Sequence, residues 1–305
     1  MVSRFRRTGY RLLGSRFDYL LHTRPVEWPI VAGHATLGYI LAVGFRGVAE
    51  ARELGSAMLG IGLWVVALNG GTLALNSAYD RDESDVAYLR RPPPAPAHLA
   101  GFGLSLMLAG LVLAFLLPAA YRAAYGLCLI LSLLYSTPPI RLKAVAGADW
   151  IINMVGFGTL TPFAGWAATG LGLTRSGGLI LAGFCPLFAA LYPLTQIYQF
   201  REDARRGDRT LARALGVRGS LIVSVAAAVI AFGCFSLAAK LAGWTSKDGW
   251  RWLGLALAGA SWAAVLLPWI RRHRAMDDRE HQRGMYYALA AWAVTDAAVG
   301  LGWGL

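Results

Sequence analysis

Long apolar blocks alternate with shorter polar segments along the whole chain. Nine blocks have about the length that a helix needs to cross a bilayer: residues 27–46, 56–79, 98–117, 120–136, 148–170, 178–198, 219–239, 252–270 and 284–304. The fourth block is the shortest and carries Arg122 near its start. The pattern predicts an all-α integral membrane protein with nine transmembrane helices around a central cavity.

The composition agrees with this class of protein. Hydrophobic residues make up 56% of the chain and charged residues only 15%, a balance unlike that of soluble globular proteins. No linker divides residues 1–305, so we expect a single membrane domain. Residues 1–26 form its cytoplasmic or interfacial N-terminal segment, in which Arg alternates with Phe, Tyr and Leu as in a helix lying at the membrane surface.

The net charge of +12 is distributed unevenly between the polar segments. The N-terminal segment and every second loop hold 22 of the 29 Lys and Arg residues. This asymmetry follows the positive-inside rule and predicts a cytoplasmic N-terminus in the inner membrane of the cell. The charge lies on no polar domain, so nucleic acid is excluded as a partner and membrane lipid is expected. The longest polar connections, 80–97, 199–218 and 271–283, then face the cytoplasm.

Two acidic clusters lie in these predicted cytoplasmic connections. The first contains Asp80, Asp82, Glu83 and Asp85, and the second contains Glu202, Asp203 and Asp208. An amide precedes each cluster by four residues, Asn76 before Asp80 and Gln199 before Asp203. In a helix, this spacing places both side chains of each pair on one face.

Clustered carboxylates repel one another unless a cation lies among them. Mg²⁺ prefers hard oxygen ligands, and phosphate enzymes hold it with one or two carboxylates plus substrate phosphates. Nearby arginines could neutralise the remaining phosphate charge: Arg81, Arg90, Arg91, Arg205, Arg206 and Arg209. A solvated face with scattered ion pairs would explain either cluster alone. Two clusters on the same predicted side favour a magnesium and diphosphate site.

The order of these motifs resembles that of the UbiA superfamily of intramembrane prenyltransferases. Asn76 and Asp80 match its Asn-x-x-x-Asp motif, followed by an Arg91-Pro92-x-Pro94 step. Residues 135–143, YSTPPIRLK, match its Tyr-x-x-Pro-Pro-x-Arg-x-Lys loop, and Asp203 matches the second acid of its Asp-x-x-x-Asp motif. The chain departs from both acidic motifs, because Ser84 replaces the third acid of the first and Gln199 the first acid of the second.

The resemblance implies a Mg²⁺-dependent enzyme that removes diphosphate from an allylic prenyl diphosphate and transfers the carbocation to an aromatic or other apolar acceptor. It implies catalytic roles for Asn76, Asp80 and Asp203. The implied metal ligands are Asn76, Asp80, Asp82, Glu83, Glu202, Asp203 and Asp208. The implied substrate-binding residues are Arg91, Tyr135, Arg141, Lys143, Asn153, Gln199 and Arg209. Cationic side chains in a cytoplasmic loop and an interfacial tyrosine are alternative explanations for Arg141, Lys143 and Tyr135.

Aromatic and polar side chains inside the apolar blocks add further candidates. The aromatic faces of Tyr135, Phe157, Trp166, Tyr192 and Tyr198 could stabilise a carbocation, although most aromatic residues here serve packing. Ionisable or amide groups within spans are functional candidates by default: His34, Asn69, Asp149, Asn153 and Asp296. Hydration at a span boundary would account for Asp149, whereas Asp296 requires a partner or a wet cavity. His34 is either a base for the acceptor or an interior hydrogen-bonded histidine.

Two other functions stay open from the sequence. A terpene cyclase of the same superfamily would use the diphosphate site without an acceptor, and the altered acidic motifs are compatible with it. A non-catalytic transporter would place ionisable residues near mid-membrane. The concentration of acids in connections on one side argues against the transporter.

Overall fold

Helices make up nearly all of the computed structural model, which describes residues 4–50, 54–80, 89 and 91–305. The N-terminal part contains α1 (Arg4–Leu13), α2 (Phe17–His22), α3 (Trp28–Glu50), α4 (Leu54–Gly62), α5 (Gly70–Asp80), α6 (Leu99–Leu113) and α7 (Ala119–Ser136). The C-terminal part contains α8 (Ala148–Asn153), α9 (Thr161–Ala167), α10 (Arg175–Gln196), α11 (Phe200–Arg206), α12 (Leu211–Leu241), α13 (Gly249–Arg272) and α14 (Asp278–Gly304). Two π-helical segments, Leu63–Asn69 and Met154–Leu160, join α4 to α5 and α8 to α9.

Each predicted apolar block is helical. Seven helical runs of the described chain are long and apolar enough to cross a membrane. They begin at Trp28, Leu54, Leu99, Ala119, Arg175, Leu211 and Ser246. The fifth and ninth blocks correspond to the run from α8 to α9 and to α14. An all-helical membrane protein is therefore confirmed, whereas nine spans and a cytoplasmic N-terminus stay predictions.

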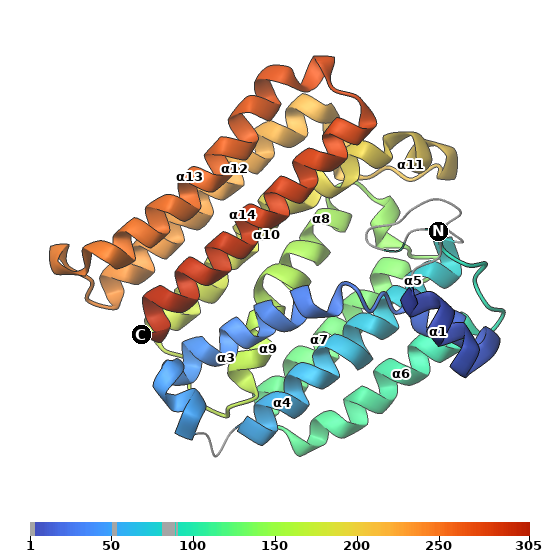
Figure 1. The fold of residues 1–305 in the computed structure, drawn as a ribbon, viewed down its shortest axis with the longest axis horizontal. Helices are drawn as coiled ribbons and strands as arrows, with labels where there is room; N and C mark the ends of the chain where they lie inside the picture. Colours follow the sequence, from blue (N-terminus) through green and yellow to red (C-terminus); the bar gives the residue numbers. More distant parts are fainter. Residues whose placement is uncertain (1–3, 51–53, 81–88, 90) are drawn as a thin grey trace.

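Two hydrophobic cores organise the bundle. In the first, α10 packs along α12, and α13 packs against α14. The second joins the α4–α5 run to α6, α7 and α9. Figure 1 shows the first group as the yellow, orange and red helices and the second mainly as the cyan and green helices, with α3 and α8 between them. A central cavity lies between the groups, since Trp292 from the first core and Trp64 from the second both line it.

Helix α3 joins the groups through close backbone contacts. Gly38 of α3 lies against the carbonyl of Pro162 in α9, and Gly165 of α9 lies against the carbonyl of Ala35. A side chain at either glycine would collide with these backbone atoms. Small residues thus permit the tight helix crossing, as they do in other membrane bundles.

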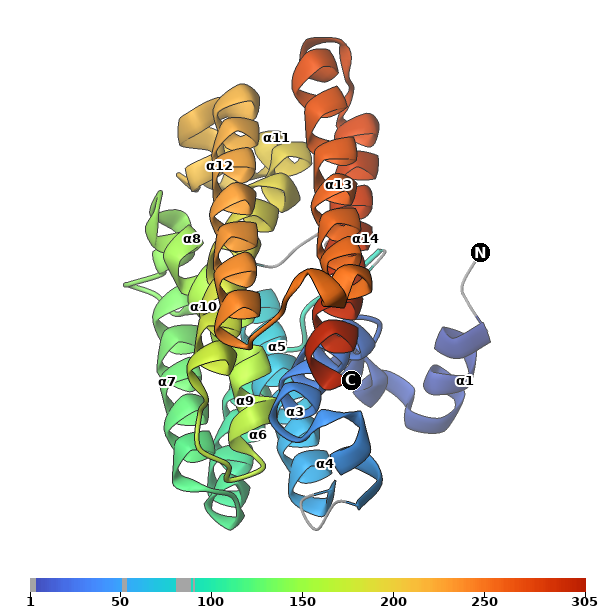
Figure 2. The ribbon, with the colours of Figure 1, turned by 90° about the vertical axis from the view of Figure 1, so that its left-hand side faces the viewer.

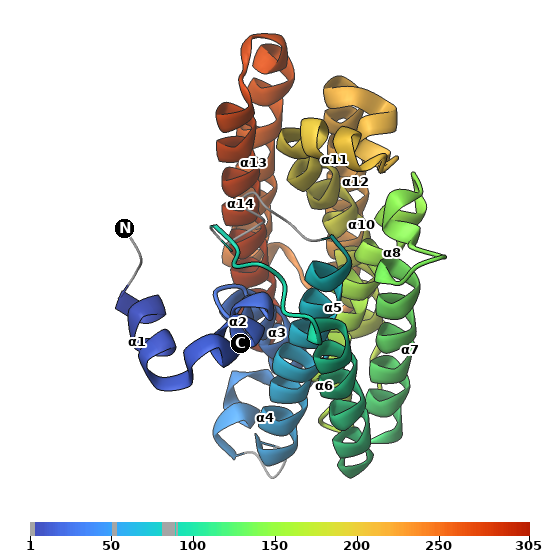
Figure 3. The same cartoon turned by 90° about the vertical axis from the view of Figure 1, so that its right-hand side faces the viewer.

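The described parts of the polar connections lie at one end of the bundle. The C-terminal end of α5, helix α11 and the turn between α13 and α14 lie away from the C-terminus (Figure 1). Helix α1 stands beside the bundle rather than within it (Figures 2 and 3). The helical form expected for the N-terminal segment is confirmed, and its position at a membrane surface stays a prediction. Asp80 and the second acidic cluster are therefore found at a single end of the molecule, whereas Asp82, Glu83 and Asp85 lie outside the described residues.

Candidate functional site

The last turn of α5 presents an amide and a carboxylate to the same cation. The ammonium of Lys143 donates to Oδ1 of Asn76 and to Oδ1 of Asp80. The i, i+4 spacing therefore places both oxygens on one helix face, as predicted. The side chains of Asp80 and Lys143 are each only 7% exposed.

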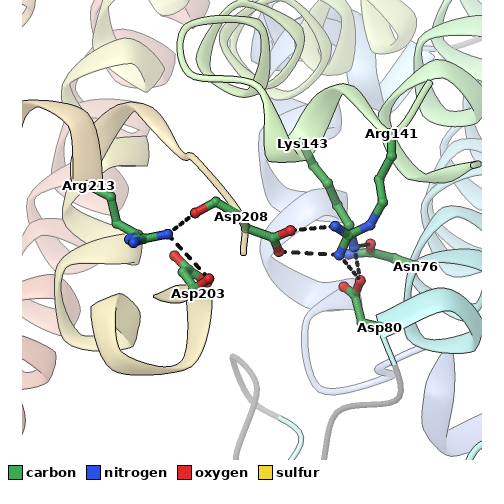
Figure 4. Close-up of polar contacts among 7 residues, drawn as sticks. All are labelled: Asn76, Asp80, Arg141, Lys143, Asp203, Asp208 and Arg213. Carbon is green, nitrogen blue, oxygen red and sulfur yellow. Dashed lines mark hydrogen bonds and ion pairs between the residues drawn. The ribbon is translucent and has the colours of Figure 1, made fainter. Parts of the chain in front are cut away.

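A loop between α7 and α8 delivers two cations to this carboxylate. Arg141 adopts a left-handed backbone conformation, with φ of 38°. Non-glycine residues pay a conformational cost there, so local structure must hold this residue in place. Its guanidinium lies 3.1 Å from Oδ1 of Asp80 and also forms a two-point contact with the carboxylate of Asp208, including a 3.2 Å bond to Oδ2. Arg141 thus joins the first acidic cluster to the second, as Figure 4 shows.

Backbone contacts fix the second cluster against the same loop. The amide of Arg209 donates to the carbonyl of Ala144 at 3.1 Å, and Val145 and Arg209 form an isolated β-bridge. Arg213, in the first turn of α12, donates to the carbonyl oxygens of Asp203 and Asp208 (Figure 4). These contacts hold the turn after α11 so that the carboxylate of Asp208 points toward Arg141.

The carboxylates keep Arg141 charged. Burial lowers the pKa of Arg141, but its hydrogen bonds to Asp208 and Asp80 more than offset this effect and raise the pKa above its ordinary value. Asp208 is 5% exposed and Asp203 is 8% exposed. The site is therefore a largely buried network of charges in which cations and carboxylates alternate.

A cavity of about 310 Å³ extends into the bundle from this network. Asn76 lines it at the charged end, while most of the wall is apolar or aromatic. Four of the five aromatic residues proposed for carbocation stabilisation line it, namely Tyr135, Phe157, Tyr192 and Tyr198. The fifth, Trp166, is instead buried and donates to the carbonyl of Leu171. Both π-helical segments contribute to the wall, a local distortion that often occurs at functional sites.

The other predicted site residues are distributed around the network and the cavity. Asn153 lines the cavity and donates to the carbonyl of Asp149, and the hydroxyl groups of Tyr135 and Tyr192 lie 2.9 Å apart. Arg91 and Arg209 are exposed. Glu202 lies in α11, one residue before Asp203. Asp82 and Glu83 lie outside the described residues.

Gln199 does not share a helix face with Asp203, so that prediction is wrong. A short 3₁₀ turn, Ile197–Gln199, separates α10 from α11, and Gln199 caps α11 with a non-helical backbone. Its amide donates to the hydroxyl of Tyr198 at 3.0 Å. The break in the helix redirects the side chain, and sequence spacing alone did not reveal this break.

Asp149 is a buried structural residue rather than a hydrated one. Its side chain has no exposure and accepts hydrogen bonds from the amides of Gly147 and Leu211 and from Nε2 of Gln196. The hydration predicted for it is therefore wrong. These bonds connect the start of α8 to α10 and α12, and so support both loops of the charged network.

Within the described part of the chain, no three His, Cys, Asp or Glu side chains form a group that could hold a metal ion. The oxygens of Asn76, Asp80 and Asp208 instead surround the cationic groups of Arg141 and Lys143.

The sequence interpretation missed Arg213 altogether. The sequence signal for Arg213 was its position in the first turn of α12. Thr210, three residues before Arg213, caps the N-terminus of this helix.

A helical membrane bundle with a charged network at the mouth of an aromatic cavity defines the class of this protein. The sequence matches the profile of the UbiA prenyltransferase family over residues 28–293. The chain therefore belongs to the UbiA prenyltransferase family. A search of the curated proteins finds no match.

Several solved structures share the fold. A UbiA homologue from Archaeoglobus fulgidus, bound to DMAPP and Mg²⁺, has a TM-score of 0.65 and 17% identity, covering 91% of this chain and 99% of that one. A digeranylgeranylglyceryl phosphate synthase has a TM-score of 0.69 and 14% identity, covering 94% and 97%. An apo UbiA homologue from Aeropyrum pernix K1 has a TM-score of 0.62 and 18% identity, covering 89% and 94%. At these identities the likeness establishes the fold.

Proposed function

We propose that this protein is a Mg²⁺-dependent prenyltransferase that moves a prenyl group from a prenyl diphosphate to an apolar or aromatic acceptor. One observation carries the proposal: Arg141 joins Asp80 and Asp208 at the mouth of an aromatic cavity whose wall includes Asn76. The acidic clusters and the cavity thus supply adjacent sites for a diphosphate and its hydrocarbon tail. Family membership and the Archaeoglobus fulgidus homologue structures with DMAPP or GPP and Mg²⁺ support it.

The oxygen atoms at the charged end fit a hard divalent cation. Oδ1 of Asn76 and Oδ1 of Asp80 already converge on one positive group, the Lys143 ammonium. Carboxylate and amide oxygens are suitable Mg²⁺ ligands, particularly when substrate phosphates complete the coordination. The residues that would hold Mg²⁺ are Asn76, Asp80, Asp82, Glu83, Glu202, Asp203 and Asp208. When bound, Mg²⁺ would stabilise negative charge on the leaving diphosphate.

The cations of the α7–α8 loop are the chain's own groups for binding diphosphate. Arg141 and Lys143 contact carboxylates in the structure, and a diphosphate would offer the same cations more negative charge. Arg91, Arg209 and Gln199 would contribute further donors at the rim. In this role the loop orients the leaving group, and its charge lowers the barrier to breaking the carbon–oxygen bond.

The cavity would receive the prenyl tail. Its apolar wall excludes water that would otherwise quench an allylic carbocation. The aromatic rings of Tyr135, Phe157 and Tyr192 offer electron-rich faces to such a cation, and Asn153 adds an amide to the wall. We also propose that the charged end faces the cytoplasm from the inner membrane, so that a soluble diphosphate reaches it directly.

Diphosphate release tests this proposal. The purified full chain, in lipid nanodiscs with geranyl diphosphate, Mg²⁺ and 2-naphthol as an aromatic acceptor, should release diphosphate, and EDTA should abolish the release. Asp80→Asn should reduce the rate by at least about 100-fold, which corresponds to the loss of one strong electrostatic contact. Asp278→Asn is the control, because Asp278 is exposed and pairs with Arg201 at 3.6 Å. Full activity with EDTA, or in Asp80→Asn, would contradict the proposal. A cyclised hydrocarbon formed without any acceptor would instead assign a terpene cyclase.

A further inference from the structure

His34, in the wall of the central cavity, pairs with Asp296, whose side chain is 19% exposed and lines a different pocket. Nδ1 of His34, in α3, lies 3.1 Å from both carboxylate oxygens of Asp296, in α14. Trp292 donates its indole N–H to Oδ2 of the same carboxylate at 3.2 Å. The imidazole is 4% exposed and lines the cavity that also contains Asn76. His34 is thus separate from the network of Arg141 and Lys143 but lines the same cavity as Asn76.

Two aromatic side chains hold the imidazole in place. Phe184 and Trp292 make edge-to-face contacts with the ring, at centroid distances of 4.8 and 4.9 Å. A carboxylate at Nδ1 fixes the proton on that nitrogen and leaves the lone pair of a neutral imidazole on Nε2. In this neutral form, Nε2 is a hydrogen-bond acceptor.

In the neutral form of the ring, the group nearest to Nε2 is a second acceptor, and a ligand hydroxyl would resolve this mismatch. Nε2 lies 3.4 Å from the carbonyl oxygen of Gly158, in the π-helical segment before α9. A carbonyl oxygen only accepts hydrogen bonds, so it cannot satisfy the lone pair of a neutral imidazole. A ligand hydroxyl donating to Nε2 would satisfy it. If Nε2 then gained a proton, its N–H could donate to the Gly158 carbonyl while Asp296 stabilised the positive ring.

We propose that His34 binds the hydroxyl group of an alcohol or phenol acceptor and accepts its proton, with Asp296 as the positioning residue. This inference rests on the proposed prenyl transfer. When the hydroxyl oxygen is prenylated, that oxygen forms the bond to C1 of the prenyl group. The C1–oxygen bond to the diphosphate breaks, and its electron pair leaves with the diphosphate. The hydroxyl proton passes to Nε2 of His34, so charge and atoms balance.

Binding of two matched probes tests the hydroxyl site without requiring turnover. The probes are 2-naphthol and 2-methoxynaphthalene, which differ by replacement of the O–H by O–CH₃. Equilibrium dialysis of the detergent-solubilised full chain, with empty micelles subtracted, gives the ratio of their Kd values. We expect the wild type to prefer 2-naphthol by about tenfold, the effect of one buried hydrogen bond.

The variants are chosen so that the fold survives. His34→Leu alone leaves a carboxylate without its imidazole, which is costly in a buried site. His34→Leu combined with Asp296→Leu removes both partners and keeps the helices apolar. His281→Leu is the control, since His281 is also a buried histidine that accepts a hydrogen bond, from Trp269, but does not line the cavity. The preference for 2-naphthol should disappear in the double variant and persist in the control.

The outcomes separate this inference from the proposed function. Binding of geranyl diphosphate in the presence of Mg²⁺ should be unchanged in the double variant, while product formation with 2-naphthol should fall at least 100-fold. A wild type that binds the probes equally or not at all would overturn the inference, as would a preference that survives in the double variant. Failure of diphosphate release in the wild type would contradict the proposed function instead, and the probe ratio would still decide the role of His34.

Discussion

The contact between Asp80 and Lys143 provides a quantitative test of the charged network. The perturbations are Asp80→Asn, Lys143→Gln and the two combined, all close to the original side chains in size. Both side chains are 7% exposed, and the ammonium donates to the carboxylate. Arg141 also contacts Asp80, at 3.1 Å. The carboxylate therefore serves two cations, and the two single variants should differ in cost.

The expected loss of unfolding free energy in each variant depends on which charged groups remain without a partner. Asp80→Asn takes this carboxylate away from two cations at once, Lys143 at 7% exposure and Arg141 at 23%, and breaking the buried pair with Lys143 costs about 3–5 kcal/mol. Lys143→Gln leaves Asp80 with the Arg141 guanidinium, so it should cost only about 1.5–3 kcal/mol, the range for one hydrogen bond to a charged group. The double variant should cost less than the sum of the two, because the second change no longer breaks an intact pair.

Equilibrium unfolding in mixed detergent micelles, followed by tryptophan fluorescence, gives the free energy of unfolding of the wild type, the two single variants and the double variant. The matched control is the cycle of Arg201→Gln and Asp278→Asn, whose side chains are 88% and 55% exposed and lie 3.6 Å apart. Solvent screening should leave this control pair with no measurable coupling. A coupling between Asp80 and Lys143 no larger than that of the control would refute the buried network, as would equal costs for the two single variants.

Three further predictions concern packing, burial and pH. Gly38→Ala should cost about 1–3 kcal/mol in unfolding free energy because its Cβ meets a backbone carbonyl, whereas Gly33→Ala in the same helix meets open space and should be neutral. Asp149→Ala should cost about 3 kcal/mol or more, measured the same way, since three donors lose their acceptor. Burial lowers the pKa of His281 below its ordinary value of 6.5, so stability should decline as the pH falls below about 6.5. His281→Gln should flatten this decline, and an unchanged pH slope would contradict the assignment.

Hydrophobic patterning was sufficient to find the helices, because burial in lipid and burial in protein both require apolar residues over a full span. The block with Arg122 near its start is a regular helix, α7, as predicted. Patterning could not show that the fifth block consists of two α-helices joined by a π-helical segment, since all three parts are apolar. Hydropathy predicted residues 284–304 of α14 but not the start of this helix at Asp278, because its first turns are polar.

The site was only partly predictable for a different reason. Local spacing correctly paired Asn76 with Asp80, because both lie in one continuous helix. It failed for Gln199, where the chain leaves helical geometry just before α11. The partnership of His34 with Asp296 joins residues 262 positions apart, and that of Arg141 with Asp208 joins residues 67 apart. Such contacts depend on the packing of α3 on α14 and on the bridge between two loops, neither of which local sequence encodes.

The departure from the second acidic motif, at Gln199, has a structural consequence. Gln199 replaces an acid, and its amide is bound to the hydroxyl of Tyr198 rather than directed to the charged network. Asp208 instead supplies the carboxylate of the second cluster that meets Arg141, because the Ala144–Arg209 backbone contact holds the turn after α11 against the α7–α8 loop. A carboxylate on a turn can move more easily than one on a helix. We therefore expect Asp208→Asn to lower diphosphate release more than Gln199→Ala, and the reverse order would show that the motif position, rather than the contact with Arg141, governs the reaction.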